Sequence, residues 1–350
     1  MRRLTLVFLL VLLMVTAGCR PKTTRYQAEF LGLFDTVTTI IGYAESKEEF
    51  TALARQVQEQ LAKYHRLFDI YHNYEGVNNL KTINDHAGVA PVKVDREIIA
   101  LLLFAKAQYY ATGGAVNIAL GPVLKIWHDY RTQGILDPHA AEVPPRHLLV
   151  EAARYTTLEG LIIDEAAATV YLPDARMRLD VGAVAKGFAV ERVARQLEAE
   201  GVSSLLLSVG GNIRAIGGKP DGKGVAPWKI GIKNPDPESP VPQLCNVLIR
   251  GEAVVSSGVY ERYYTVDGTR YHHIIDPHTL MPADYFTSVT VISRDSGLAD
   301  ALSTALFILP LETGLELVEG LDGVEALWVT DSGEVISSAG FSAYLEEQSW

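Results

Sequence analysis

The sequence predicts an α+β fold. Segments whose apolar residues recur with helical spacing occur in both halves of the chain, and short β-rich segments lie between and after them. The order shows no regular β-α-β alternation, which counts against a doubly wound parallel sheet. The 350 residues, 48% of them hydrophobic, suffice for a sizeable core in one large domain or two smaller ones.

The N-terminal segment, MRRLTLVFLLVLLMVTAGCR, reads as an export signal. Two arginines precede an apolar run from Leu4 to Ala17, and these 14 residues are fewer than the roughly 20 needed to span a bilayer. The run ends in Ala17-Gly18-Cys19, which resembles a bacterial lipoprotein box. We therefore expect residues 1–18 to be a lipoprotein signal peptide and Cys19 to carry lipid on the outer face of the cytoplasmic membrane or on a periplasm-facing membrane. Simple cleavage by signal peptidase is the alternative.

Charge and cysteine content exclude several other classes. The formal net charge of -11 argues against a nucleic-acid-binding protein and against electrostatic adhesion to anionic lipid. The second cysteine, Cys245, has no intrachain partner if Cys19 is lipidated, so no internal disulfide is expected. Its apolar surroundings, QLCNVLI, predict a buried structural thiol.

The predicted elements follow in order along the chain. Residues 19–29 read as a tether, residues 30–44 as the first strand, and residues 141–147 and 234–243 as proline-rich loops. Helical spacing predicts four helices, over residues 47–68, 96–111, 184–200 and 298–309.

The stretch LDVGAVAKGFAVERVARQL, residues 179–197, predicts a strand, a glycine turn and a helix. Gly182 and Gly187 permit tight backbone geometry, and a helix N-terminus presents N–H groups that favour anions. Lys186 adds a positive charge there. The order of a P-loop is absent, and the signal is weak taken alone.

A pair of glycines in LLLSVGGNIRAIGG, Gly210 and Gly211, follows a buried strand. No helix comes next, so a Rossmann site is excluded. The spacing alone favours an ordinary β-turn or bulge over a place where the backbone approaches a ligand.

Asp300 and Thr304 are four residues apart in the last predicted helix, so their oxygens share one face. A carboxylate and a hydroxyl in this arrangement suit a hard cation such as Mg²⁺. An ordinary polar stripe is the alternative, and on spacing alone it is favoured.

Three of the nine histidines lie in RYHHIIDPHTLMPA, residues 270–283. The preceding segment predicts a hairpin with a turn at VDGT. His272 and His273 then face opposite sides of a strand, which counts against a zinc pair. One of them suits a general base, and His278 is expected to face solvent.

Together these segments resemble the ApbE-type flavin transferases, also called FAD:protein FMN transferases. The resemblance runs from about Phe30 to Tyr344 and rests on five segments in the right order: ATGGAVNIALGPVLKIW, LDVGAVAKGFAV, SVGGNIRAIG, SSGVYERYY with RYHHIIDPHTLMPA, and ADALSTALFIL. It implies an ApbE-like, T-fold-related domain over residues 30–350, with mixed sheets, packed helices and an active site in a cleft between subdomains.

The resemblance also implies a chemistry. Such enzymes bind FAD and Mg²⁺, which Mn²⁺ can replace. They transfer FMN to a threonine or serine hydroxyl of an acceptor protein, here expected to be an extracytoplasmic electron-transfer protein, and they release AMP. Carried over, His273 is the general base, and the metal ligands are Asp300, Thr304 and the carbonyl of Ala183. The FAD contacts are Phe34, Tyr71, Ala115, Val116, Asn117, Asp180, Lys186, His273 and Ile274.

The sequence departs from the family pattern at three places. Val116-Asn117 stands where the family has Phe-Asp, Phe34-Asp35-Thr36 replaces Met-Gly-Thr, and Thr279-Leu280 displaces a Thr-Gly pair. None of these changes touches the base or the metal ligands. Two other classes stay open: a metal-dependent FAD pyrophosphatase that gives FMN and AMP, and a flavin-binding lipoprotein without catalysis.

Overall fold

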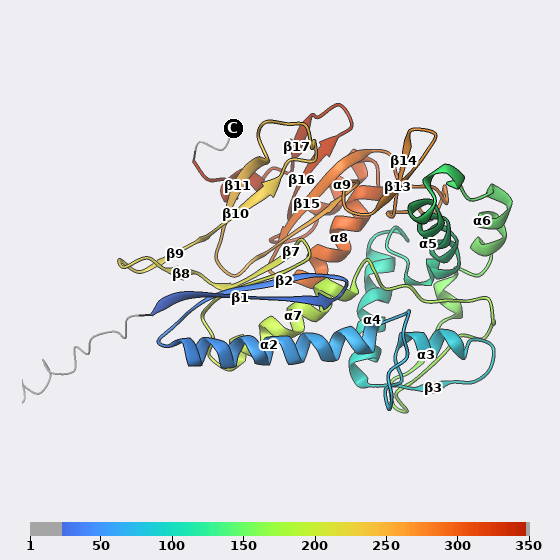
Figure 1. Cartoon of the computed structure of the whole chain (residues 1–350), viewed down its shortest axis with the longest axis horizontal. Helices are drawn as coiled ribbons and strands as arrows, with labels where there is room; N and C mark the ends of the chain where they lie inside the picture. Colours follow the sequence, from blue (N-terminus) through green and yellow to red (C-terminus); the bar gives the residue numbers. More distant parts are fainter. Residues whose placement is uncertain (1–22, 348–350) are drawn as a thin grey trace, which may run out of the picture.

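A computed structural model describes residues 23–347 and confirms the α+β class. Its centre is an eight-stranded sheet in the order β1-β2-β6-β7-β12-β15-β16-β17, in which every neighbouring pair is antiparallel (Figure 1). The strands are β1 Thr24–Leu33, β2 Thr36–Ala44, β6 Ser204–Val209, β7 Asn212–Gly217, β12 Ala253–Gly258, β15 Phe286–Ser293, β16 Glu325–Thr330 and β17 Val335–Ser337.

The four helices expected from periodicity are present, within two residues at each end. They are α2 Lys47–Phe68, α4 Arg96–Ala111, α7 Ala185–Ala199 and α8 Ser296–Ile308. Four shorter or less periodic helices were not predicted: α3 Leu80–Asp85, α5 Gly121–Leu136, α6 Arg146–Ala153 and α9 Leu311–Glu319. Asp295 caps α8 by accepting from Leu298 N, and Pro310 follows its end.

Both faces of the large sheet are buried. In β6, Leu205 and Leu207 join a core shared with α2, α7 and α8, while the intervening Leu206 faces a second core. The hairpin of β10 Trp228–Lys233 and β11 Gln243–Ile249 covers that second face. Because successive side chains of a strand alternate between faces, a strand buried on both sides reads as a continuous apolar run.

A second lobe lies beside the sheet (Figure 1). It contains α3 to α6, the three-stranded sheet β3-β5-β4 and the hairpin of β13 Tyr263–Val266 and β14 Thr269–His272. The strands of its small sheet are β3 Val92–Lys93, β4 Ile162–Asp164 and β5 Thr169–Tyr171. A third apolar cluster joins α5, α6, β13 and the segment after β14.

The N-terminal part of the domain differs from the prediction. The tether predicted over residues 19–29 is wrong from Thr24 onward, because β1 begins there and pairs with β2 along its whole length. The single strand predicted over residues 30–44 is therefore a hairpin. Phe34 and Asp35 make its turn, both with φ of 53°, a left-handed conformation that glycine or asparagine usually adopts. No glycine or asparagine stands at the two turn positions to mark the reversal.

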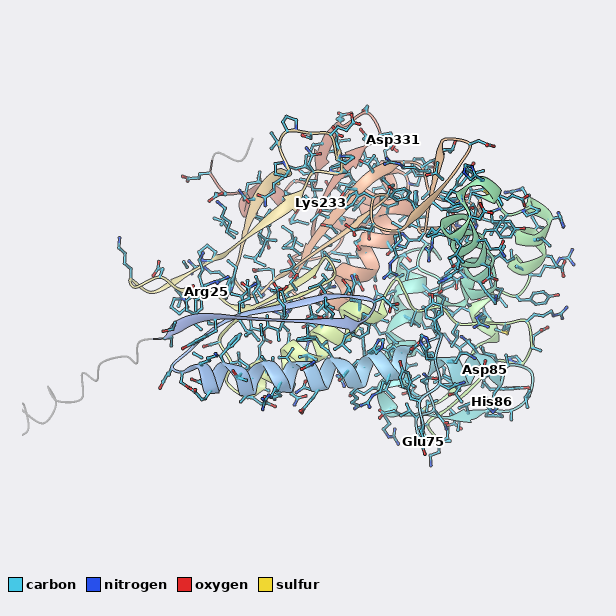
Figure 2. The ribbon with its side chains drawn as sticks, in the orientation of Figure 1. Arg25, Glu75, Asp85, His86, Lys233 and Asp331 are labelled. Carbon is cyan, nitrogen blue, oxygen red and sulfur yellow. The ribbon has the colours of Figure 1, made fainter. Side chains whose placement is uncertain are left out.

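Charged side chains such as Arg25, Glu75, Asp85 and Asp331 lie at the periphery (Figure 2). Among residues 23–347, no helix is both long enough and apolar enough to cross a membrane. Cys245 is a buried free cysteine, as expected, and burial raises the pKa of its thiol to about 11. The predicted signal peptide and Cys19 lie outside the described residues.

Candidate active site

A cavity of about 920 Å³ opens between the large sheet and the second lobe. This volume suits a ligand of dinucleotide size. Residues from β2, α7, α8, β10, α5 and the segment after β14 line it, and all the predicted site residues are among them. Those residues are Phe34, Tyr71, Ala115, Val116, Asn117, Asp180, Ala183, Lys186, His273, Ile274, Asp300 and Thr304.

The N-terminus of α7 meets α8 at Asp300. One carboxylate oxygen of Asp300 accepts a hydrogen bond from Gly187 N at 2.7 Å, and the other contacts Lys186 Nζ at 3.1 Å. A Cβ on residue 187 would collide with Asp300 Cβ and the carbonyl of Ser296. Gly187 is therefore required by the close approach of the two helices, and this approach brings Lys186 and Asp300 together.

A polar stripe on α8 faces the cavity, as the four-residue spacing predicted. Asp300, Thr304 and Ile308 line the cavity, and the other residues of this part of the helix are buried in the core. Gly187 N donates to Asp300 and not to the carbonyl of Ala183. Among the described residues, no N–H group donates to the Ala183 carbonyl. The wall of the cavity thus presents a carboxylate, a hydroxyl and a free carbonyl.

These donors are all oxygen atoms, which is the ligand set that Mg²⁺ prefers. In this structure Asp300 is paired with the ammonium group of Lys186, so its carboxylate already faces a positive charge. Within residues 23–347 no group of three or more His, Cys, Asp or Glu side chains is arranged to hold a metal ion. A metal bound here would therefore depend on Thr304 and the Ala183 carbonyl as well as on Asp300.

A buried ion pair fixes the start of α8. Glu191 of α7 accepts hydrogen bonds from Ser296 N at 2.8 Å and from Arg214 Nε at 3.0 Å. Arg214 and Glu191 are only 4% and 5% exposed, and removing one partner of such a buried pair costs about 3–5 kcal/mol. The network holds Ser296, one turn before Asp300, against α7.

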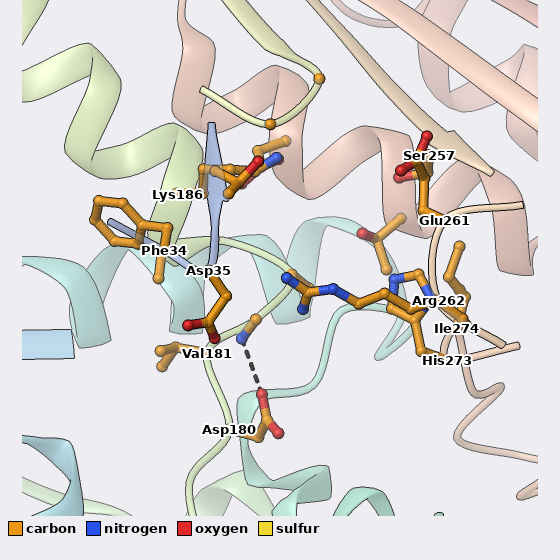
Figure 3. A pocket seen from close by; sticks show the side chains of 18 of the residues that line it. Phe34, Asp35, Asp180, Val181, Lys186, Ser257, Glu261, Arg262, His273 and Ile274 are labelled. Carbon is orange, nitrogen blue, oxygen red and sulfur yellow. Dashed lines mark hydrogen bonds and ion pairs between the residues drawn. The ribbon is translucent and has the colours of Figure 1, made fainter. Parts of the chain in front are cut away.

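Asp180 lies in the turn between the preceding segment and α7, on the cavity wall. Its carboxylate accepts from Gly182 N at 2.9 Å (Figure 3). Burial raises the pKa of Asp180. Nearby, Tyr71 Oη lies 3.1 Å from His128 Nδ1, and the Tyr71 side chain is 49% exposed. An aromatic ring at the mouth of a cavity offers a stacking surface to a planar ligand.

The segment after α4 contributes backbone more than side chains. Ala115 and Val116 are buried, and Val116 N donates to Thr112 Oγ1. The Asn117 side chain caps the short helix that follows by accepting from Ala119 N, and its amide donates to Thr156 O. Asparagine can replace the acid of the family pattern as a cap acceptor, because either side chain offers the required oxygen.

The turn of the β1–β2 hairpin brings Phe34 to the cavity. Its N–H donates to His65 Nδ1 at 3.2 Å, and the two rings meet edge to face at 5.6 Å. Asp35 stands where the family pattern has glycine, and aspartate tolerates the left-handed conformation better than most residues. Gly210 and Gly211 form the next hairpin turn and also line the cavity, so they serve both as a β-turn and as a close backbone wall.

The two adjacent histidines have different surroundings. His272, the last residue of β14, is buried; its ring packs against Phe307, its Nε2 donates to Ala283 O, and its Nδ1 accepts from Ile274 N. His273 follows the strand, and its Nδ1 donates to Arg262 O at 3.2 Å. This tautomer leaves Nε2 of His273 as the basic nitrogen. His278 is exposed, as expected.

The surroundings of His273 keep it neutral. Burial, and then the positive charges of Arg262 and Arg131, lower the pKa of His273 to about 3. A free histidine has a pKa of about 6.5. His273 is therefore available as a proton acceptor throughout the neutral range.

We expect a titration to show this directly. In NMR spectra of ring-labelled protein, His273 should stay neutral at pH 5, where a free histidine is charged. The unfolded chain binds the extra proton between about pH 6.5 and pH 3, so the contribution of His273 to stability is complete above pH 6.5 and is lost as the pH falls through that window. A His273 ring that titrates near pH 6.5 would contradict the lowered pKa of this residue.

Two arginines of the cavity, Arg262 and Arg131, were not predicted. Arg262 lies in the link between β12 and β13, within the segment SSGVYERYY. That segment carries part of the family resemblance, which was the sequence feature that could have pointed to Arg262. Arg131 lies on α5, where nothing in the sequence pointed to a site. Figure 3 shows Arg262 extending from beside His273 toward the middle of the cavity.

Comparison with known proteins gives a consistent result. The chain is 39% identical over 274 residues to a FAD:protein FMN transferase of Treponema pallidum, covering 75% of this chain and 73% of that protein. It is 34% identical over 289 residues to one of Klebsiella pneumoniae, covering 82% and 85%. The crystal structure of an ApbE protein from Thermotoga maritima superimposes with a TM-score of 0.79 at 29% identity, covering 93% of this chain and all of that one. Flavin transferase ApbE from Vibrio cholerae gives 0.75 at 26% identity, covering 92% of this chain and all of that one.

The fold, the cavity and these relatives define an enzyme of the transferase class. The model of the ApbE family matches residues 34–328, and the chain belongs to the ApbE family.

Proposed function

We propose that this protein transfers FMN from FAD to a threonine or serine hydroxyl of an acceptor protein and releases AMP. The observation that carries the proposal is the single cavity in which a neutral histidine, an oxygen-lined cation site and a helix N-terminus come together. The relatives are named FAD:protein FMN transferases, which supports the transfer of FMN from FAD to a protein.

In this proposal the cavity binds FAD along its length. Tyr71 and Phe34 supply aromatic surface for the flavin ring. Lys186 and the positive end of the α7 dipole favour the negatively charged pyrophosphate. Asp180, Ile274 and the backbone of residues 115–117 complete the contacts.

The oxygen donors of Asp300, Thr304 and Ala183 would hold Mg²⁺, or Mn²⁺ in its place. A divalent cation there supplies charge stabilisation to a pyrophosphate that is being cleaved. Lys186 would then release Asp300 and turn its charge toward the pyrophosphate, which is the larger anion.

The transfer itself needs one base. Nε2 of His273 accepts the proton of the acceptor hydroxyl, and the hydroxyl oxygen forms a new bond to the phosphorus of the FMN half. The bond from that phosphorus to the bridging oxygen breaks, and AMP leaves with that oxygen and its electron pair. Water in place of the acceptor would give FMN and AMP, so exclusion of water from the cavity separates transfer from hydrolysis.

Incubation with FAD, Mg²⁺ and a candidate acceptor tests the proposal. We expect in-gel flavin fluorescence on the acceptor, a mass increase of one FMN, and AMP in equal amount. AMP with free FMN and no modified acceptor would identify a pyrophosphatase instead. Bound FAD without AMP would identify a flavin-binding protein without catalysis.

We also propose that the enzyme is exported and anchored by lipid on Cys19, because the segment before it has the features of a lipoprotein signal. This location would place the enzyme beside extracytoplasmic electron-transfer proteins as acceptors.

Substitution of Cys19 tests the anchor. Cys19→Ala should release the protein from the membrane fraction and leave FMN transfer in a detergent-free assay unchanged, because residue 19 precedes the folded domain. Cys245→Ala, which removes the buried thiol, is the matched control and should stay in the membrane fraction. A Cys19→Ala protein that is processed and still membrane-bound would exclude this anchor.

A further inference from the structure

Two arginine side chains enter the cavity from different elements. Arg131 comes from α5 and Arg262 from the link between β12 and β13, and both line the cavity together with His273 and Asp180. Burial and then the charge of Arg262 lower the pKa of Arg131, while Tyr71 and Asp180 act in the opposite direction, as expected for groups that line the same cavity.

Neither guanidinium has a protein partner in the described part of the chain: no hydrogen bond or ion pair joins Arg131 or Arg262 to another side chain or carbonyl there. Five other arginines of this acidic protein are paired with carboxylates, namely Arg154, Arg176, Arg192, Arg195 and Arg214. Two unpaired like charges in one partly buried site disfavour the empty protein, and an anion between them removes the repulsion.

The position of Arg262 relative to the base limits where that anion lies. The backbone carbonyl of Arg262 accepts from both N and Nδ1 of His273, at 3.1 Å and 3.2 Å. The side chain of Arg262 then runs from His273 toward the middle of the cavity (Figure 3). An anion held by this guanidinium lies toward the middle of the cavity, in the same site as the base.

We propose that Arg131 and Arg262 together bind the phosphoryl group of FMN while it passes from FAD to the acceptor hydroxyl. This inference rests on the proposed function, because the phosphorus under attack must lie within reach of a hydroxyl that His273 deprotonates. Guanidinium groups match phosphate oxygens in pairs of parallel hydrogen bonds. They would stabilise the charge on the transferred group, while the cation site holds the pyrophosphate from the other side.

The first experiment measures binding without metal, acceptor or turnover. FMN and riboflavin, which lacks the phosphate, are titrated into the apo-protein by flavin fluorescence. In the wild type we expect FMN to bind about 10–100-fold more tightly, as charge-assisted hydrogen bonds to one phosphate provide. Arg131→Gln and Arg262→Gln should each lose most of that difference and leave riboflavin affinity unchanged. Arg154→Gln, at the exposed C-terminal cap of α6, is the control and should behave as wild type.

The second experiment measures the rate of FMN transfer in a single turnover, at saturating FAD, Mg²⁺ and acceptor. Each glutamine variant should transfer FMN about 10²-fold more slowly or worse. Arg262→Lys keeps the charge without the paired hydrogen bonds, so its transfer rate should lie between those of the wild type and Arg262→Gln. Equal FMN and riboflavin affinities in the wild type would overturn the proposal. So would glutamine variants that only raise the KM for the acceptor, since the arginines would then recognise an acidic group of the acceptor.

These experiments distinguish a failure of the proposed FMN transfer from a failure of the proposed arginine site. If the wild type modifies no acceptor but prefers FMN over riboflavin through the arginines, the anion site stands and FMN transfer to protein does not. If the wild type flavinylates its acceptor and both glutamine variants do so at the same rate, the transfer stands and the role of the arginines does not.

Discussion

Asp300→Ala should abolish Mg²⁺-dependent turnover. Asp300 supplies the single carboxylate among the three oxygen donors of the proposed cation site, and a methyl group cannot replace a charged ligand. Loss of several kcal/mol of charge stabilisation corresponds to about 10³-fold or more in rate. The measurement is AMP release from FAD across a series of Mg²⁺ concentrations.

Asp300 also accepts from Gly187 N and contacts Lys186, so the alanine variant loses contacts within the protein as well. Asp300→Asn separates the two effects, because an amide oxygen can still accept from Gly187 N but carries no charge. We expect the asparagine variant to fold normally and to be nearly as inactive. Thr304→Ala should do less harm, since it removes a neutral ligand.

Asp295→Asn is the matched control for Asp300. Asp295 is on the same helix, where it caps the first turn and pairs with Arg195. Asparagine keeps the capping oxygen, and the residue does not line the cavity. Wild-type rate and metal dependence in Asp300→Asn would rule out the site described here, and a requirement for zinc would contradict the whole scheme.

Periodicity predicted the long helices because their burial follows local sequence. In α2, the residues Phe50, Val57 and Leu61 repeat on one face and are all buried. The helix α5 is as long as α4, with 16 residues, but it has a glycine near each end, and its packing depends on β13 and the segment after β14, far along the chain. Tertiary contacts of that kind leave no local pattern.

The first hairpin was missed for a different reason. A two-residue turn with positive φ is normally marked by glycine or asparagine, and here it is made by Phe34 and Asp35. The hydrogen bond from Phe34 N to His65 holds this unfavourable turn, and His65 is 31 residues away. The composition of residues 30–44 predicted β-structure, but nothing in it predicted that the chain reverses direction at Phe34 and Asp35.

Site residues were predictable where one element carries the chemistry. The spacing of Asp300 and Thr304 put both side chains on one face of a helix, while their assignment as metal ligands came from the resemblance to a family and stays a prediction. The meeting of Lys186 with Asp300 spans 114 residues of sequence, and Arg131 approaches Arg262 from another lobe. Such pairs arise only when helices and sheets pack against each other. The resemblance to a family suggested that Lys186 and Asp300 share a site. Nothing in the local sequence suggested that Arg131 and Arg262 do.

His273→Ala should slow FMN transfer by about 10²–10⁴-fold, which is the usual cost of losing a general base. Its Nδ1 donates to Arg262 O, so Nε2 is free to accept the proton of the acceptor hydroxyl, and the lowered pKa keeps it unprotonated. Binding of FAD should persist in the variant, because the cavity has many other contacts. A single-turnover assay measures the rate of FMN transfer, and a separate FAD titration measures FAD binding, so the two effects are distinguished.

The neighbouring histidines provide the controls. His272→Ala removes two hydrogen bonds and a ring contact with Phe307, so we expect a lower Tm with transfer retained per folded molecule. His278→Ala, at an exposed turn, should change neither quantity. If His272→Ala stopped transfer and His273→Ala did not, the base would be the buried ring. That result would require the strand end at residue 272 to shift, because Nε2 and Nδ1 of His272 are both engaged with the backbone, and a ring so engaged has no nitrogen left to accept a proton.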